Sequence, residues 1–256
     1  MARRAEKAQR FASRAVQVGF LLALLILWYL ATNYWGVNRL LLPDPIAVWH
    51  QLVDVLRSGA YLPDLRVTAT EFAVAFVLAT TSGTVVGYVV SRSRYLIRVF
   101  EPLLAGIFSI PLILFLPLYV LFFGLGLESK IALGTTISFF PIVLATIAGF
   151  SNVDRTLVTA ARSMGASDYQ LFRYVLLPGA LPVILGGLRI GFTIALLSIL
   201  GSETIASLAG LGHHIVELAE DMEMSRMFAY IAFVVAIVAL LNGVVSHLEA
   251  RGRRRG

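Results

Sequence analysis

The sequence predicts an all-α, polytopic membrane protein with six transmembrane helices, on three observations. Of its 256 residues, 58% are hydrophobic, against roughly 45 to 50% in an ordinary soluble domain. Six segments reach the ~20 mostly apolar residues that a helix needs to cross a bilayer. Basic residues gather at the chain ends and between apolar segments, which favours a role in membrane topology over nucleic-acid binding.

Each predicted span is an apolar segment bounded by polar residues: 15–36, 68–91, 99–123, 130–150, 182–207 and 227–248. The first follows a basic head, as in a secretory signal peptide, but its apolar part exceeds the ~7 to 15 residues of such a peptide. It ends in Tyr34 and Trp35, as spans do at a membrane interface. We therefore predict a retained first span.

The basic residues orient the chain. An even number of spans places both termini on one side, and cytoplasmic segments carry the excess of Lys and Arg. With cytoplasmic termini, the outer segments hold only Arg39, Arg57, Arg66, Lys130 and Arg226. We predict one transmembrane domain over residues 1–256, whose parts are a cytoplasmic tail 1–14, a core 15–248 that contains a cytoplasmic helical loop 151–181, and a basic cytoplasmic tail 249–256.

The first outer segment predicts a short amphipathic helix on the outer, periplasmic surface. Asp44 and Pro45 suit the N-cap and first position of a helix, and Ser58 and Gly59 suit its end. Between them, apolar residues recur at helical spacing: Ile46, Trp49, Val53 and Leu56. Covering the bundle is favoured for this helix over a binding role.

Three prolines interrupt predicted spans and are candidate pathway residues. Pro111 and Pro117 fall in the third span, and Pro141 falls in the fourth. A proline removes a backbone donor and bends a helix. Bent backbone at membrane depth either lines a water-filled cavity or is buried in protein, so a pathway and ordinary kinked packing both remain open.

Two ionisable residues of the fifth span are candidate pathway or gate residues, because charges inside a membrane are costly and often functional. Arg189 is near the cytoplasmic end, where its side chain can extend to the interface. Glu203 is near the outer end, where it could pair with Arg66, stabilise a gate or lie in interfacial water.

Between the fourth and fifth spans the sequence predicts two short helices. The first has an apolar edge made of Leu157, Ala160, Ala161 and Met164. Gly165 can end it in the left-handed conformation. Ser167 to Gln170 fit the Ser-x-x-Gln capping box that begins a second helix, and Pro178 is expected to end that helix. Ordering costs ~1 to 2 kcal/mol per residue, so this loop must pack on its own protein or on a partner.

The loop resembles a known motif. Ala160–Ala161, three residues, Gly165, nine residues, Val175, then Leu177–Pro178 match the spacing of the EAA motif of importer-type ABC transporter permeases. The chain departs from that family at Thr159, where Glu is usual. Further segments resemble the nitrate/sulfonate/taurine subgroup, and the likeness covers residues 42–248: they are 42–52, 100–130, 139–154, 187–191 and 203–212.

The resemblance implies a permease subunit of the bacterial cytoplasmic (inner) membrane that is not itself an enzyme. Its implied partners are a second permease copy, two cytosolic ATPases that bind ATP and Mg, and an external solute-binding protein that delivers a small solute such as an anion or a vitamin precursor. The residues implied in ATPase docking are Thr159, Ala160, Ala161, Gly165, Ala166, Ser167, Asp168, Tyr169, Leu177 and Pro178.

The remaining site classes have weaker support. Gly124 to Lys130 lack the GxxxxGK[ST] pattern of a phosphate loop, so the chain is expected to hold no nucleotide cofactor. There is no cysteine, and the adjacent His213 and His214 do not share a helix face, so no metal site is expected. The alternative function is an ion-coupled secondary transporter, but the spans lack the central Asp/Glu relay and internal repeat typical of that class.

Overall fold

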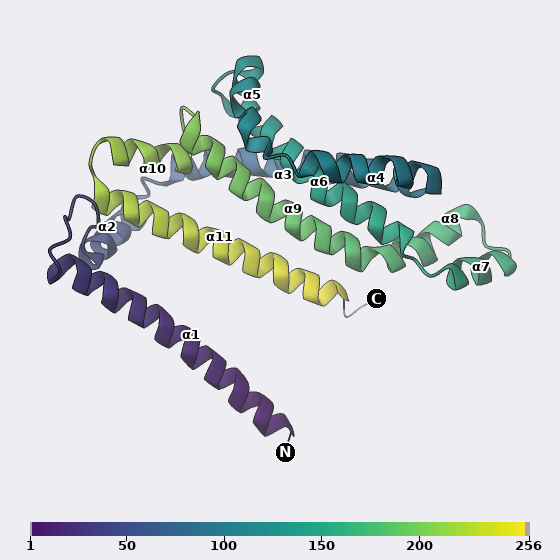
Figure 1. Cartoon of the computed structure of the whole chain (residues 1–256), viewed down its shortest axis with the longest axis horizontal. Coiled ribbons are helices and arrows are strands. Elements are labelled where there is room, and N and C mark those ends of the chain that lie inside the picture. Colours follow the sequence, from purple (N-terminus) through teal and green to yellow (C-terminus); the bar gives the residue numbers. More distant parts are fainter. Residues whose placement is uncertain (1, 254–256) are drawn as a thin grey trace. The chain divides into compact units, whose positions relative to one another are not determined.

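The computed structural model describes the backbone of residues 2–253 and the side chains of residues 16–247. The side chains of the two predicted basic tails, residues 1–14 and 249–256, lie outside the described part. No β-strand occurs in residues 2–253. The elements follow one another along the chain (Figure 1): α1 (Ala2–Asn33), α2 (Pro45–Ser58), α3 (Leu62–Ser91), α4 (Arg94–Phe108), η1 (Leu112–Phe115), α5 (Leu116–Phe123), α6 (Leu127–Ser151), α7 (Arg155–Ser163), α8 (Asp168–Leu171), η2 (Phe172–Leu176), α9 (Leu177–Ile205), α10 (Leu211–Glu220) and α11 (Met224–Arg253).

Helices of membrane-spanning length confirm the all-α, polytopic fold. Five described stretches are long and apolar enough to cross a membrane: Val16–Asn33, Leu62–Ser91, Leu127–Ser151, Asp168–Ile205 and Met224–His247. A sixth span is completed if α4 and the η1–α5 segment act together. α3 begins before the predicted residue 68, because Pro63 and Asp64 suit the first turn of a helix.

The predicted third span is broken. α4 ends at Phe108, and the segment Leu112–Phe123 leaves it at an angle of 74°. Pro111 sits at the break, whereas Pro117 lies in the first turn of α5, where a missing N–H costs little. Pro141 is buried inside α6, which continues past it. Their role in a pathway remains a prediction.

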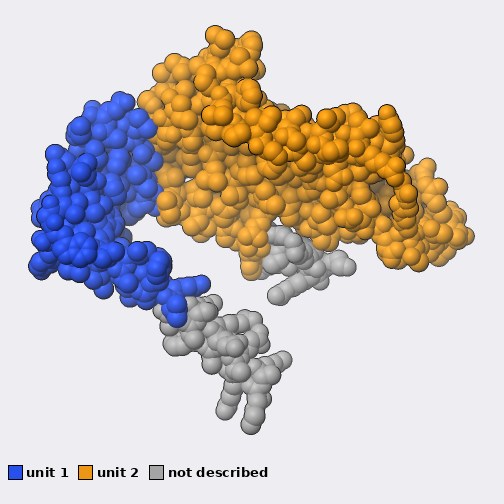
Figure 2. All heavy atoms as spheres, in the orientation of Figure 1, with its two compact units in different colours: residues 1–60, 215–233 blue, residues 61–214, 234–256 orange. Residues whose placement is uncertain are grey.

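The chain folds as two compact units (Figure 2): unit 1 comprises residues 1–60 and 215–233, and unit 2 comprises residues 61–214 and 234–256. In unit 1, Oδ1 of Asp44 accepts a 2.8 Å hydrogen bond from the amide of Ile46, as predicted for the N-cap of α2. The helix ends at Gly59, whose φ is 69°. Trp28 Nε1 donates to the carbonyl of Pro43 over 3.0 Å and so ties α1 to the start of α2.

In unit 2, α6 packs against both α3 and α9, and these three helices form the core. The buried side chains of α6 include Leu133, Val143 and Ile147. Backbone approaches are close: a Cβ on Gly87 of α3 would lie 2.6 Å from Cβ of Thr146 on α6. Small residues permit such approach in membrane helices.

The 29 residues of α9 span about 43 Å at 1.5 Å per residue. One end of this helix carries α7, α8 and η2, and the other leads into residues 206–212. The predicted docking residues and Glu203 therefore lie at opposite ends of the core.

Candidate functional site

α7 begins at a carboxylate cap. Oδ1 of Asp154 accepts a 2.8 Å hydrogen bond from the amide of Thr156. This bond, together with one from the Thr156 hydroxyl, lowers the pKa of the exposed Asp154 carboxyl. A negative charge at this position also complements the helix dipole.

The turn between α7 and α8 is built around Gly165, whose φ of 80° confirms the predicted left-handed conformation. The backbone amide of Gly165 donates to the carbonyl of Arg162 over 3.0 Å, and the backbone amide of Ala166 donates to the carbonyl of Ala161 over 3.1 Å. These two bonds form the Schellman motif, which satisfies the last carbonyls of a helix. α7 therefore ends by a defined local mechanism.

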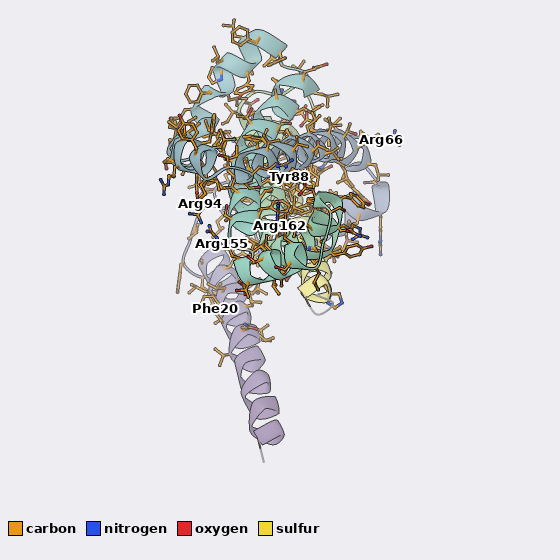
Figure 3. All side chains as sticks on the ribbon, turned by 90° about the vertical axis from the view of Figure 1, so that its right-hand side faces the viewer. Phe20, Arg66, Tyr88, Arg94, Arg155 and Arg162 are labelled. Carbon is orange, nitrogen blue, oxygen red and sulfur yellow. The ribbon has the colours of Figure 1, made fainter. Side chains whose placement is uncertain are left out.

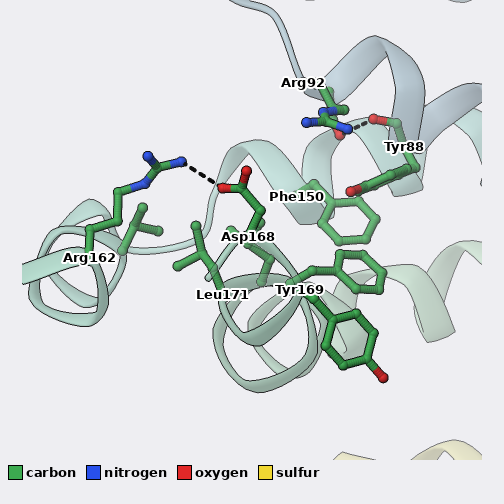
Figure 4. Close-up of a pocket in the computed structure, with 11 residues that line it drawn as sticks. Tyr88, Arg92, Phe150, Arg162, Asp168, Tyr169 and Leu171 are labelled. Carbon is green, nitrogen blue, oxygen red and sulfur yellow. Dashed lines mark hydrogen bonds and ion pairs between the residues drawn. The ribbon is translucent and has the colours of Figure 1, made fainter. Parts of the chain in front are cut away.

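α8 begins with the predicted capping box. The Gln170 amide donates to Oγ of Ser167 over 3.3 Å, and the Ser167 amide donates to Oε1 of Gln170 over 2.9 Å. Arg162 and Asp168 approach to 3.4 Å across the turn (Figure 4). Both of their side chains are exposed, so this ion pair adds little stability.

Pro178 does not end the second helix, contrary to the sequence prediction. The helical path is continuous from Asp168 to Ile205. Within it, η2 is a π-helical turn, in which the Leu177 amide bonds to the carbonyl of Phe172, five residues back. Pro178 follows in the first turn of α9. Because the π turn is wider than an α-helical turn, the helix accommodates the ring and the missing N–H of Pro178 without breaking.

Loop 151–181 packs on its own protein through one face only. A cavity of about 490 Å³ lies between the loop and the ends of α3 and α6. Tyr88, Phe150 and Leu171 line that cavity (Figure 4). The Tyr88 ring lies 5.1 Å from the rings of both Phe150 and Phe172, edge to face. These aromatic contacts anchor the loop to the ends of the core helices.

The opposite face is open. Of the ten predicted docking residues, Ala161 is buried, Ala166 and Leu177 are half-buried, and the other seven are exposed. Large apolar side chains of the loop are exposed: Met164 is 82% exposed, and Tyr169 and Tyr174 are each 72% exposed. Basic residues border the loop at this end of unit 2, among them Arg94, Arg155 and Arg162 (Figure 3). Ordered helices that leave apolar side chains exposed are suited to binding another protein.

At the other end of α9, Glu203 does not pair with Arg66 and does not lie in interfacial water. Arg66 is exposed (Figure 3), whereas Glu203 is 1% exposed. Oε1 of Glu203 accepts a 2.6 Å bond from the Thr68 hydroxyl, and Oε2 accepts a 2.7 Å bond from the Gly212 amide. Burial and two donors explain why a partner from the exposed surface is not needed. Arg189, the other ionisable candidate, is exposed on α9.

Two buried ionisable residues were missed. Glu71 of α3 is 1% exposed, and Lys130, placed in an outer segment by the sequence prediction, is fully buried in the first turn of α6. Nζ of Lys130 donates to the carbonyls of Leu125 and Gly126. The lone charge of Glu71 in an apolar segment was the signal that could have revealed it.

Comparison with known proteins assigns the whole arrangement to a family. Residues 75–254 match the family described as binding-protein-dependent transport system inner membrane component. The sequence is 32% identical to the taurine transport system permease protein of Escherichia coli, over 88% of this chain and 84% of that protein. It is 30% identical to the riboflavin transport system permease protein of Chloroflexus aurantiacus, over 90% of this chain and 87% of that protein.

Another relative is the putative aliphatic sulfonates transport permease protein of Bacillus subtilis, 28% identical over 89% of this chain and 83% of that protein. Among solved structures, a chain of an inward-facing methionine ABC transporter matches with a TM-score of 0.64 and 20% identity, over 74% of this chain and 94% of that chain. A chain of an amino acid ABC transporter crystallised with histidines matches with a TM-score of 0.63 and 22% identity, over 80% of this chain and 98% of that chain. These structures share the fold.

Proposed function

We infer how this chain works from its family: it belongs to the inner membrane components of binding-protein-dependent transport systems and is the permease subunit of an ABC importer. Its relatives are permease subunits, which are not themselves enzymes. The relatives named for taurine, riboflavin and aliphatic sulfonates support a small organic solute as the cargo, either an anion or a vitamin precursor.

In this proposal two copies of the chain, folded as a single transmembrane domain, enclose the pathway in a bacterial inner membrane. Both termini and loop 151–181 face the cytoplasm. Two cytosolic ATPases bind ATP and Mg and dock on the loop, and an external solute-binding protein delivers the cargo to the other side. ATP-driven closure of the ATPases passes through the loop into α9.

The observation that carries the docking assignment is the combination of order and exposure in loop 151–181. A Schellman turn and a capping box specify the backbone between Ala161 and Gln170. Met164 and Tyr169 nevertheless remain open to solvent. A partner that covers these side chains would gain apolar burial and would find the backbone already ordered, which lowers the cost of binding.

The test is reconstitution of the permease with its ATPase in lipid vesicles. Tyr169→Ala, Gly165→Leu and the Ser167→Ala/Asp168→Ala double variant should insert normally but lose most of the coupling between ATP hydrolysis and uptake. Tyr34→Ala is the matched control, because Tyr34 is 73% exposed and lies outside the loop. Wild-type coupling in all three loop variants contradicts the docking assignment, and uptake without any ATPase contradicts the importer itself.

A further inference from the structure

Three fully buried ionisable side chains meet at the end of unit 2 that is opposite loop 151–181. Glu71 comes from α3, Lys130 from α6 and Glu203 from α9, and none is more than 1% exposed. Lys130 interacts electrostatically with both carboxyl groups. Buried charges are costly unless they are paired and hydrogen-bonded, so the bonding of each group limits its protonation state.

Glu203 acts as an acceptor through both oxygens. Its Oε1 faces the Thr68 hydroxyl at 2.6 Å, and its Oε2 faces the Gly212 amide at 2.7 Å. The Thr68 hydroxyl donates its proton to Oε1 of Glu203 and accepts a 2.9 Å hydrogen bond from the Leu211 amide. An ionised carboxylate, which only accepts, fits this environment.

The Glu71 carboxyl interacts with the Glu203 carboxyl through a side-chain hydrogen bond. No donor among the described residues faces its Oε2 atom. Two ionised carboxylates cannot hydrogen-bond to each other, because both only accept. A proton on Glu71 resolves this conflict by turning it into the donor. It also balances the charge, since Lys130 then neutralises Glu203 alone.

Two further carboxylates lie near the cluster and do not alter this balance. Asp64 of α3 is half-buried, and its Oδ1 accepts the Gly210 amide over 3.3 Å. Glu128 of α6 is exposed to solvent. Both therefore retain access to water, unlike the three buried groups.

The cluster also holds a loop. Three consecutive amides, those of Gly210, Leu211 and Gly212, donate to Asp64, Thr68 and Glu203 respectively. Gly210 has a φ of 108°, and a Cβ on this residue would collide with the Glu203 carboxyl. A Cβ on Gly212 would lie 2.7 Å from Cβ of Glu203. The segment 206–212 is therefore shaped to fit closely around one carboxylate.

We propose that Glu71 carries a proton, which it donates to the Glu203 carboxylate, and that this pair beside Lys130 is a clasp that fastens the segment 206–212 to α3. Glu71, Lys130 and Glu203 are thus positioning residues. The placement of the clasp on the external face, where α9 would carry movement from the ATPases to it, rests on the proposed function. The proton on Glu71 and the attachment of the segment 206–212 to α3 do not depend on the proposed function.

Two isosteric substitutions give opposite expectations. Glu71→Gln supplies an N–H donor in place of the proton, so it should leave the melting temperature within about 2 °C of wild type. Glu203→Gln removes the charge that balances Lys130 and turns an NH₂ group toward one of the donors, so it should lower the melting temperature by roughly 5 to 10 °C. Glu128→Gln is the matched control on exposed surface and should change nothing.

The fastening is read out locally. The chain has no cysteine, so Leu208→Cys, at a residue 70% exposed in the held segment, accepts a single nitroxide label in the full chain. Glu203→Gln should increase the mobility of that label, whereas Glu71→Gln and Glu128→Gln should not. Equal mobility in all variants, or equal loosening by both glutamine substitutions, overturns the clasp.

The proton is read out by infrared spectroscopy, which needs no destabilised variant. The difference spectrum between wild type and Glu71→Gln should contain the carbonyl stretch of a protonated carboxylic acid. A carboxylate band there in its place overturns the assignment of the proton. Neither spectrum depends on an ATPase or a binding protein, so failure of the importer proposal leaves this result intact.

Discussion

The hydroxyl of Thr68 donates a 2.6 Å hydrogen bond to Oε1 of Glu203, joining α3 to α9 between residues 135 apart in sequence. Both side chains are buried. The same hydroxyl accepts the Leu211 amide, so one small side chain serves as donor and acceptor in the core of unit 2. Its loss would remove one hydrogen bond from the buried Leu211 amide and one from Oε1 of Glu203.

We expect Thr68→Val, which keeps the shape and removes the hydroxyl, to lower the free energy of unfolding by about 2 to 4 kcal/mol. The measurement is the melting temperature in detergent. Thr68→Ser keeps the hydroxyl and should retain most of the stability. Thr70→Val is the control, because the exposed Thr70 bonds only to the Arg66 carbonyl of its own helix; a loss there as large as at Thr68 would refute the explanation.

Gly165 gives a prediction that depends on backbone conformation alone. A Cβ at this position would meet nothing within 4 Å, so Gly165→Ala should cost only the strain of φ 80°, about 1 to 2 kcal/mol. Gly165→Asn should cost less, since Asn tolerates the left-handed region. The amides of residue 165 and Ala166 should exchange slowest with Gly at position 165, faster with Asn and fastest with Ala. Faster exchange in the Asn variant than in the Ala variant would contradict this mechanism.

The capping box can be tested one bond at a time. Ser167→Ala should weaken the start of α8 by about 1 kcal/mol and speed exchange of the Gln170 amide about fivefold. Ser167→Thr should preserve the bond to Gln170. Unchanged exchange in the Ala variant would show that the packing of Leu171, and not the cap, orders this turn.

The cap of α7 predicts a pH dependence in acid. Hydrogen bonds from Thr156 lower the pKa of Asp154 below its ordinary value of 3.8. The cap therefore stabilises α7 fully above that value and is lost as pH falls through the lower pKa of the folded state. A nitroxide at Thr159→Cys, on exposed α7 surface, should gain mobility only in that acid range. Asp154→Asn keeps a neutral cap and should abolish this transition.

Close packing in the core predicts an effect of a single methyl group. Gly87→Ala would place Cβ 2.6 Å from Cβ of Thr146 and should destabilise the protein by about 1 to 3 kcal/mol. Gly106→Ala, on exposed surface of α4 with nothing within 4 Å, should be neutral or slightly stabilising. Thermal unfolding of the two variants side by side checks the difference, and an unchanged melting temperature for Gly87→Ala would refute it.

Features that act within a turn or two of the chain could be predicted from sequence. The apolar segments located the spans because a bilayer requires uninterrupted apolar helix. Asp44 and Ser167 marked helix starts, and Gly165 marked a helix end, because caps are local bonds between neighbours. The motif spacing in loop 151–181 was sufficient to indicate the family to which the chain belongs.

Only the tertiary structure decided which polar groups meet in the core and how the chain passes Pro178. A π turn accommodates that proline, and helical periodicity gives no sign of it. Glu71, Lys130 and Glu203 come from three helices, and each looked like an isolated charge when the sequence was read along its length. The physical reason is that their partners are set by packing among α3, α6 and α9, which brings together residues far apart in sequence, whereas hydrophobic periodicity describes each helix alone.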